Sequence, residues 1–313
     1  MGPVQPMLAT PGALPTGPGW AYELKWDGVR VLVDVGPEGF GMTSRRGNDV
    51  SAAYPELAGL RDACPDILLD GEVVALSDGR PSFAALQNRM HVRSASQARR
   101  LAGTIPVTYF AFDILRLYGV DLTARPYAER RSTLERLELS GPNWTVPPAF
   151  DDGPATIAAA EQNGLEGVVA KRLAAPYRPG ARSADWIKVR IGNRQEFVVG
   201  GWEAGEGGRA GGIGALLLGY YDAAGTLRYA GQVGTGFTAR KLVELGDRLS
   251  LLRRPANPFA DMPPEVRGRA LTFVDPELVV EVEFAEWTPE GRLRFASFQG
   301  ERDDKDPQEV RRE

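Results

Sequence analysis

The sequence contains very little cysteine, histidine or lysine. A single cysteine among 313 residues, Cys64, excludes a disulfide framework and a cysteine-rich zinc site, and is typical of the reducing cytosol. The single histidine, His91, argues against a histidine-based metal site or catalytic triad. No apolar run reaches the roughly 18 residues that a membrane span needs, and residues 1–19 lack the features of a signal peptide. We therefore expect a cytoplasmic protein.

An excess of positive charge is also missing. The chain has 37 lysines and arginines against 41 aspartates and glutamates, so its net charge is −4. It lacks the net positive charge that is typical of nucleic-acid-binding proteins. Any surface that binds a polyanion must therefore be a local basic patch. The hydrophobic fraction of 43% is that of an ordinary globular protein, and the length favours two domains.

Only five of the basic residues are lysines: Lys25, Lys171, Lys188, Lys241 and Lys305. Arginine supplies positive charge almost everywhere else. A position that keeps lysine indicates an amine that can lose its proton and attack an electrophile, which a guanidinium cannot do. Chance and composition bias are the competing explanation for any one of the five.

The first part of the chain mixes strand and helix patterns. Valines recur at every second position of residues 29–35, which predicts a half-buried strand. Asp70-Gly71 separates two short apolar runs and predicts two strand pieces joined by a turn or bend. Arg130 and Arg131 should lie on the exposed face of a surface helix. We predict further strands at 107–115, 168–171 and 186–190, and helices at 82–90, 128–139 and 155–163.

The second part is dominated by strand patterns. We predict strands at 196–202, 215–221, 227–233, 278–286 and 293–298, with one helix at 239–252 for which Thr238 is the N-cap. Five strands and one helix in this length suit a small closed barrel of the oligonucleotide-binding (OB) type. The change in pattern places the domain boundary near residue 193, so the expected domains are 1–193 and 194–313.

Six short motifs occur in order along the first domain. They are Glu23-Leu-Lys25-Trp-Asp27-Gly-Val-Arg30, Ser44-Arg45-Arg46-Gly47, Leu69-Asp70-Gly71-Glu72, Phe110-Ala-Phe112-Asp113, Glu166-Gly-Val-Val-Ala-Lys171 and Trp186-Ile-Lys188-Val-Arg190. The C-terminal end adds Arg302-Asp-Asp-Lys305. A surface turn is the commoner explanation of a lone Lys-x-Asp-Gly string, but the ordered set is far more specific than any member.

This set resembles the ATP-dependent DNA ligases of the covalent nucleotidyltransferase superfamily, from about Trp20 to Val310. The residues within and around the motifs are similar to those of compact bacterial ligases, including the ligase modules linked to end joining. The resemblance implies an α+β fold: a nucleotidyltransferase (ATP-grasp-like adenylation) domain of antiparallel sheets and helices, then an OB-fold β-barrel domain with the last motif. It also implies a DNA ligase that seals 5′-phosphate/3′-hydroxyl nicks through a lysyl-AMP and a DNA-adenylate.

The resemblance assigns the catalytic residues. Lys25 matches the nucleophile, which attacks the α-phosphorus of ATP and holds AMP as a phosphoramidate. Asp27 would orient the lysine or the waters of a metal. Lys188 and Arg190 would clamp the α-phosphate. The family usually has lysine at the position of Arg190, so charge stabilisation carries over to this chain while a proton-donating role does not.

The resemblance also assigns nucleotide, metal and DNA contacts. Glu72 and Glu166 would be ligands of Mg²⁺, because a hard divalent cation prefers oxygen ligands. Mn²⁺ is the alternative ion. Glu72 would also contact the ribose. The remaining assignments are Glu23 to the adenine amino group, Arg30 to the ribose side, Phe112 to stacking on adenine, Arg45 to the DNA 5′-phosphate, and Arg302 and Lys305 to the pyrophosphate.

Two other readings remain open from the sequence. An RNA ligase or a capping-type nucleotidyltransferase shares the lysine motif and the two-domain plan. A non-catalytic protein that binds DNA ends would keep the fold without the chemistry. For the ligase we expect nicked or broken duplex DNA as partner, recruitment by a DNA-end-binding clamp or repair polymerase, a role in DNA repair, and a monomer in the bacterial cytosol or nucleoid.

Overall fold

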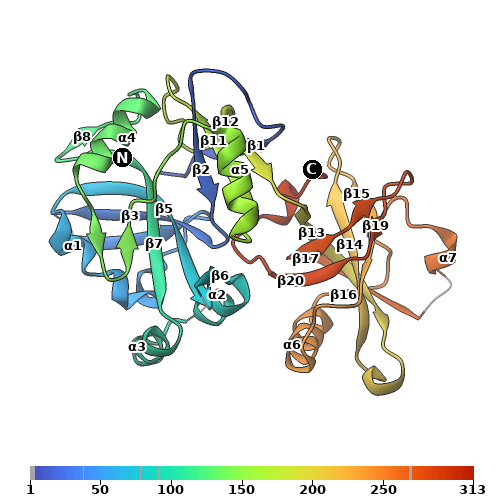
Figure 1. The fold of residues 1–313 in the computed structure, drawn as a ribbon. Coiled ribbons are helices and arrows are strands. Elements are labelled where there is room, and N and C mark those ends of the chain that lie inside the picture. The colour runs from blue at the N-terminus through green and yellow to red at the C-terminus, as the bar shows by residue number, and fades with distance from the viewer. Residues whose placement is uncertain (1–3, 38, 78, 91, 268–269) are drawn as a thin grey trace. The chain divides into compact units, whose positions relative to one another are not determined.

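The computed structural model describes residues 4–37, 39–77, 79–90, 92–267 and 270–313. The chain divides into two compact units, Met1–Ile191 and Gly192–Glu313 (Figure 1). This division falls two residues before the boundary that we expected from the sequence. His91, for which a structural role was expected, lies outside the described residues. None of the helices in the described ranges is both long and apolar enough to cross a membrane.

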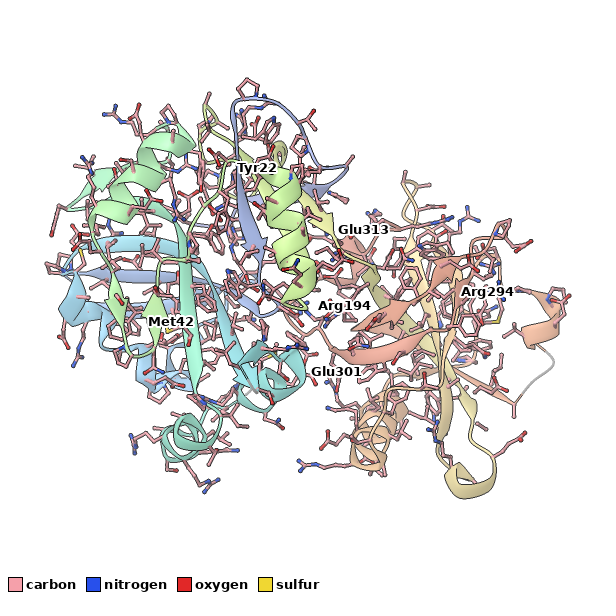
Figure 2. All side chains as sticks on the ribbon, viewed as in Figure 1. Tyr22, Met42, Arg194, Arg294, Glu301 and Glu313 are labelled. Atoms are coloured by element: carbon pink, nitrogen blue, oxygen red, sulfur yellow. The ribbon has the colours of Figure 1, made fainter. Side chains whose placement is uncertain are left out.

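Unit 1 contains a four-stranded sheet, here called sheet A. Its strand order is β1-β12-β11-β2, and all neighbours are antiparallel except β1 and β12. Helix α5 (Gly153–Gln162) packs against the two strands at one edge, where Tyr22 and Ala160 share a small apolar cluster (Figure 2). The strands are β1 (Leu8–Pro11), β2 (Trp20–Lys25), β11 (Gly167–Arg172) and β12 (Arg182–Arg190).

The second sheet of unit 1, sheet B, follows the path β4-β3-β5-β7-β10-β9, with β6 paired to β5 and β8 to β7. Alternate residues of β3 reach its two faces. Val31 and Val33 join the main core of the unit, which also holds Met42 (Figure 2), whereas Leu32 joins a second cluster with Trp186 of sheet A. The strands are β3 (Val29–Gly36), β4 (Gly39–Ser44), β5 (Ile67–Ser77), β6 (Arg80–Pro81), β7 (Val107–Leu117), β8 (Val120–Asp121), β9 (Ser140–Gly141) and β10 (Trp144–Thr145).

Short helices complete unit 1. They are α1 (Leu60–Ala63), α2 (Phe83–Met90), α3 (Ala95–Thr104) and α4 (Tyr127–Arg136), with 3-10 turns η1 (Ser51–Ala53) and η2 (Pro55–Leu57). The sequence did not predict α3. Its N-cap is Ser94, whose Oγ accepts a hydrogen bond from the Gln97 N–H, but only Ala98 is fully buried. A helix with one small buried residue has no apolar stripe for periodicity to detect.

The expected turn at Asp70-Gly71 is wrong. Strand β5 runs through both residues, and its pairing with β7 carries an irregularity there instead. A Cβ atom on Gly71 would come within 2.4 Å of the Tyr109 ring and 2.6 Å of the Phe110 carbonyl oxygen. The glycine is therefore needed for close approach of the neighbouring strand rather than for a turn.

The expected exposure of Arg130 and Arg131 is also wrong. Both are buried, because Tyr127, Arg130, Arg131 and Leu134 form the i, i+3, i+4, i+7 face of α4 that packs inward. Arg130 donates two hydrogen bonds to the Asp113 carboxylate, of 2.8 and 2.9 Å. Charge was a misleading guide because a paired arginine can occupy a core position.

Unit 2 is built on a six-stranded antiparallel sheet with the path β15-β14-β13-β17-β16 and with β20 paired to β17. Its core contains apolar residues from both faces of the long strands β13 and β17. Thr238 caps α6, as predicted, by accepting a hydrogen bond from the Lys241 N–H. The elements are β13 (Asn193–Ala204), η3 (Gly207–Arg209), β14 (Ile213–Tyr221), β15 (Leu227–Val233), α6 (Ala239–Ser250), β16 (Arg253–Arg254), α7 (Pro264–Arg267), β17 (Leu271–Phe284), β18 (Glu286–Trp287), β19 (Leu293–Arg294), β20 (Ser297–Glu301) and η4 (Pro307–Glu309).

We predict that Arg130→Ala lowers the free energy of unfolding by about 3–5 kcal/mol, because it leaves the buried Asp113 carboxylate without its partner. Chemical denaturation followed by circular dichroism measures the effect. Arg136→Ala, at an exposed position of the same helix, is the matched control and should change the free energy by less than about 0.5 kcal/mol. Equal unfolding midpoints for the two variants would contradict the prediction.

Candidate active site

The register of sheet A gathers the charged residues of three motifs on one face. Lys25 of β2 and Arg190 of β12 both lie opposite Gly167 of β11, one on each side. Two residues along the same strands, Glu23 and Lys188 lie opposite Val169 in the same way. Because side chains alternate along a strand, these positions project from the same face of the sheet.

Sheet B supplies a second set of motif residues. Arg30 lies opposite Glu72 in register, and Glu72 lies opposite Phe110. The Arg30 guanidinium lies 4.6 Å from the ring centre of Phe112 on sheet B and 5.5 Å from that of Trp186 on sheet A. The two sheets therefore meet across these side chains, and the candidate site lies between them within unit 1.

Lys25 is held by Glu166, which is buried. Lys25 Nζ donates a hydrogen bond to Glu166 Oε2, and Arg190 Nε lies 3.0 Å from Glu166 Oε1. The carboxylate thus bridges the expected nucleophile and the expected phosphate clamp. Gly167 has a φ of 149°, and a Cβ there would lie 2.0 Å from the Val189 carbonyl oxygen, so only glycine permits this strand spacing beside Glu166.

A second carboxylate lies beside this bridge. Asp27 follows β2 and is 8% exposed. One of its carboxylate oxygens lies within 4.8 Å of a Glu166 oxygen. Two buried carboxylates at this separation offer hard oxygen ligands to a divalent cation. Their donor chemistry therefore fits magnesium.

Glu23 lies at the centre of a buried polar cluster. Lys171 Nζ lies 2.7 Å from Glu23 Oε2, the Tyr127 hydroxyl donates to Glu23 Oε1, and Arg131 lies 3.8 Å away. Burial lowers the pKa of Lys171, and Glu23 opposes this shift only in part. Burial, with the Glu23 charge adding to it, raises the pKa of Tyr127 well above its ordinary value, so the hydroxyl remains a donor.

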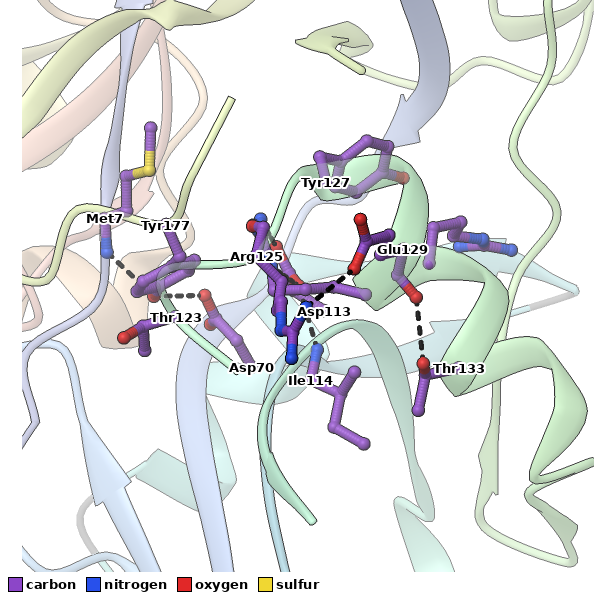
Figure 3. Close-up of polar contacts among 12 residues, drawn as sticks. Met7, Asp70, Asp113, Ile114, Thr123, Arg125, Tyr127, Glu129, Thr133 and Tyr177 are labelled. Carbon is purple, nitrogen blue, oxygen red and sulfur yellow. Dashed lines mark hydrogen bonds and ion pairs between the residues drawn. The ribbon is translucent and has the colours of Figure 1, made fainter. Parts of the chain in front are cut away.

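Arg30 is held by a network that involves a motif residue and the N-terminal segment. Arg30 Nη2 donates to Asp70 Oδ2 at 2.6 Å, and the Tyr177 hydroxyl donates to the same oxygen at 2.6 Å. The Met7 backbone N–H in turn donates to the Tyr177 oxygen at 2.8 Å (Figure 3). The guanidinium is therefore fixed in position beside the Phe112 and Trp186 rings.

Phe112 and Glu72 differ in exposure. Phe112 is 9% exposed, and Lys171 Nζ lies 4.5 Å from its ring centre. Glu72 is partly exposed on β5. The expected stacking of Phe112 on adenine and the expected ribose and metal contacts of Glu72 stay predictions.

The phosphate-binding arginines that we expected lie in different settings. Arg45 is partly exposed directly after β4, and Arg46 beside it is exposed. In unit 2, Arg302 is buried and donates to both oxygens of Asp304 at 2.9 and 3.0 Å. Burial alone would lower the pKa of Arg302, but Asp304 raises it well above its ordinary value. Lys305 Nζ lies 3.1 Å from Glu196 Oε1. The expected roles of these residues stay predictions.

Sequence reasoning missed two residues that contact the site. Lys171 was named as one of the five lysines and as the last residue of the Glu166 motif, but it was given no role in the site. Tyr127 carried no signal, because an aromatic residue at a helix start is typical of a core position. Only the structure brings both onto Glu23.

Comparison with known families gives two matches. The family model "ATP dependent DNA ligase domain" matches residues 6–190, and "ATP dependent DNA ligase C terminal region" matches residues 209–305. The chain is 44% identical over 315 residues to the "Multifunctional non-homologous end joining DNA repair protein LigD" of Mycobacterium tuberculosis, covering 98% of this chain and 40% of that protein. It is 38% identical to the corresponding LigD protein of Pseudomonas aeruginosa, covering 98% of this chain and 36% of that protein. The chain therefore spans about two fifths of the length of these relatives.

Solved structures give the same result. A structure of "mycobacterial DNA ligase D complexed with ATP and MES" is 40% identical, covers 99% of this chain and 98% of that chain, and has a TM-score of 0.71. The ligase domain of M. tuberculosis LigD is 41% identical, with coverage of 99% and 98% and a TM-score of 0.55. The expected nucleotidyltransferase and OB-fold architecture and the expected enzyme class are confirmed. The chain belongs to the ATP-dependent DNA ligase family.

Proposed function

We propose that this chain seals 5′-phosphate/3′-hydroxyl nicks in duplex DNA with ATP. The observation that carries the proposal is the bridge from Lys25 through the buried Glu166 to Arg190, on the face of sheet A that meets Arg30 and Phe112 of sheet B. An amine, a carboxylate and a guanidinium at one point are the groups that transfer of a nucleotidyl group to lysine requires.

In the first step, the neutral Lys25 amine attacks the α-phosphorus of ATP. A bond forms between nitrogen and phosphorus, and the bond between the α-phosphorus and the pyrophosphate oxygen breaks. Glu166, which accepts a hydrogen bond from Lys25, is in place to hold the proton that the amine gives up. Lys188 and Arg190 stabilise the charge that develops on the α-phosphate. Asp70 and Tyr177 fix Arg30 for the ribose.

Magnesium would be held by Glu166 and Glu72, with Asp27 as a third oxygen donor. When bound, the ion would neutralise charge on the phosphates as pyrophosphate leaves. The support is the donor chemistry, since Asp27 and Glu166 place carboxylate oxygens within 4.8 Å of each other. Manganese, which takes similar oxygen ligands, is the alternative ion.

In the later steps, the DNA 5′-phosphate attacks the phosphorus of lysyl-AMP and the bond to Lys25 breaks. The 3′-hydroxyl then attacks the 5′-phosphorus, and AMP leaves. Arg45 would hold the 5′-phosphate in these steps only. Arg302 and Lys305 would orient the pyrophosphate in the first step.

The relatives support DNA as the substrate and end joining as the pathway. They are named as DNA ligases and end-joining DNA repair proteins, which favours DNA ligation over RNA ligation, capping or end binding without chemistry. We propose that the chain acts as a monomer in the bacterial cytosol on nicked or broken duplex DNA. Recruitment by a DNA-end-binding clamp or a repair polymerase would compensate for the net charge of −4.

Lys25→Ala should abolish transfer of label from α-labelled ATP to the protein, because it removes the nucleophile. Lys25→Arg should fail equally, since a guanidinium stays protonated. Denaturing gel electrophoresis after incubation with labelled ATP and magnesium measures the adduct. Lys241→Ala, on α6 of unit 2, is the matched lysine control and should retain labelling. Label that persists in Lys25→Ala would identify another nucleophile, with Lys188 the next candidate.

Arg45→Ala should spare self-adenylation and slow transfer of AMP to DNA, because it removes a cation that only the later steps use. The two half-reactions are measured separately, with labelled ATP alone and with a chase of nicked DNA. Loss of about 2–3 kcal/mol of transition-state stabilisation corresponds to a rate of AMP transfer lower by roughly 30–150-fold. If Arg45→Ala prevents label from reaching Lys25, the assignment of Arg45 to the DNA phosphate is wrong.

A further inference from the structure

One stretch of unit 1 has a charge that is opposite to that of the whole chain. Residues 79–112 contain five arginines and no aspartate or glutamate, whereas the complete sequence has a net charge of −4. The arginines are Arg80, Arg89, Arg93, Arg99 and Arg100. The motifs of the candidate active site explain none of them. A local basic surface in an acidic chain is the feature expected of a site for a polyanion.

The stretch forms a fixed platform of α2, α3 and the turns beside them. Arg89 is fully buried and donates two hydrogen bonds to the Glu56 carboxylate, at 2.8 and 2.9 Å. The same guanidinium donates to the Ala53 and Ile105 carbonyl oxygens at 2.8 and 2.5 Å. These bonds join α2 to η1, to η2 and to the end of α3. Arg89 is therefore a structural arginine, and its partner Glu56 is already neutralised.

The two arginines of α3, in contrast to Arg89 of α2, point to solvent. Arg99 and Arg100 are exposed, and neither forms a hydrogen bond or an ion pair with any residue in the described ranges. Helix α3 itself contains no acidic residue. Asp49, an acidic residue of the nearby loop before η1, accepts hydrogen bonds from the backbone and side chain of Ser51. No carboxylate on the helix therefore competes for the two guanidinium groups.

The helix is connected by packing to the expected 5′-phosphate site. Helix α3 contacts η1 and η2, and η1 contacts β4. Arg45 and Arg46 directly follow β4. The basic helix and the Arg45 loop are thus connected through η1. A duplex whose 5′-phosphate is held at Arg45 would continue along a surface that is already basic.

We propose that Arg99 and Arg100 of α3 bind the phosphate backbone of duplex DNA beyond the nick. The proposal rests on the proposed DNA-sealing function and adds to it a named contact surface outside the chemical site. Guanidinium groups suit this role because they bind phosphate oxygens through two parallel hydrogen bonds. The contacts carry no sequence information, as a ligase that seals breaks in any sequence requires.

The size of the effect follows from counterion release. Each neutralised phosphate contributes about −0.9 to the slope of log affinity against log salt. Loss of two contacts should therefore make the slope shallower by about 1.8, and it should weaken binding at low salt by roughly tenfold or more. Self-adenylation should not change, because the first step needs no DNA.

The test compares the full chain with Arg99→Ala/Arg100→Ala. Fluorescence anisotropy measures affinity for a nicked duplex whose 3′ end is a dideoxynucleotide, which cannot be sealed, across a series of salt concentrations. Arg125→Ala/Arg136→Ala removes two exposed arginines, one just before α4 and one at its last residue, and is the matched control for net charge. Arg99→Lys/Arg100→Lys keeps the charge and should restore most of the salt slope. Self-adenylation of each variant reports that the fold is intact.

The outcomes separate the two proposals. A shallower slope in Arg99→Ala/Arg100→Ala alone, with normal self-adenylation, supports the α3 surface. An affinity and slope equal to those of the unmodified chain, or an equal loss in the Arg125→Ala/Arg136→Ala control, would overturn it. Failure of the unmodified chain to form an AMP adduct or to seal a nick would instead refute the proposed function.

Discussion

The buried Glu166 carboxylate, placed between Lys25 and Arg190, is the interaction on which unit 1 depends. An ionised carboxylate in this position is costly unless cations and hydrogen bonds compensate it. Lys25 and Arg190 come from the two strands that flank β11. The Glu166 charge is therefore compensated only in one register of β2, β11 and β12. A shift of one residue would turn Lys25 and Arg190 to the opposite face of the sheet. The apolar cluster under α5 fixes that register from one side, and the cluster around Trp186 fixes it from the other. The packing of sheet A and the chemistry of the site therefore require the same strand register.

Lysine and arginine have separate tasks in this chain. Three of the five lysines, Lys25, Lys171 and Lys188, lie on sheet A at positions that share one face. Buried arginines instead hold the scaffold together, since Arg89 and Arg130 each donate two hydrogen bonds to a carboxylate and one to each of two backbone carbonyl oxygens. A guanidinium keeps its charge when buried and presents several donors in a fixed plane. An ammonium changes its pKa readily when buried, as Lys171 does. The scarcity of lysine thus reflects a division between structural cations and the cations of the site.

The sequence was informative where period and motif coincide. Alternating valines predicted β3, and Thr238 predicted the start of α6, because both signals are local. The order of the motifs predicted the family and the two kinds of fold. Periodicity failed where polar residues occupy core positions. The inward face of α4 carries two arginines, and the glycine at Gly71 serves a close approach of Tyr109 rather than a turn. The partners of Glu23 were also inaccessible to sequence reasoning, because contacts between residues 104 or 148 positions apart depend on tertiary packing.

The last motif illustrates how one short segment can combine structure and chemistry. Arg302 is almost fully buried, and its hydrogen bonds to Asp304 close a turn in which the Lys305 N–H donates to the Arg302 carbonyl oxygen. To bind a phosphate, Arg302 would have to leave the buried Asp304 carboxylate without its partner. The free energy gained from binding the phosphate would have to offset this cost. Lys305 is 21% exposed and pairs with Glu196, so it can move at lower cost. The buried arginine therefore positions the turn, and the lysine at its end is the group of this pair better placed to meet an incoming anion.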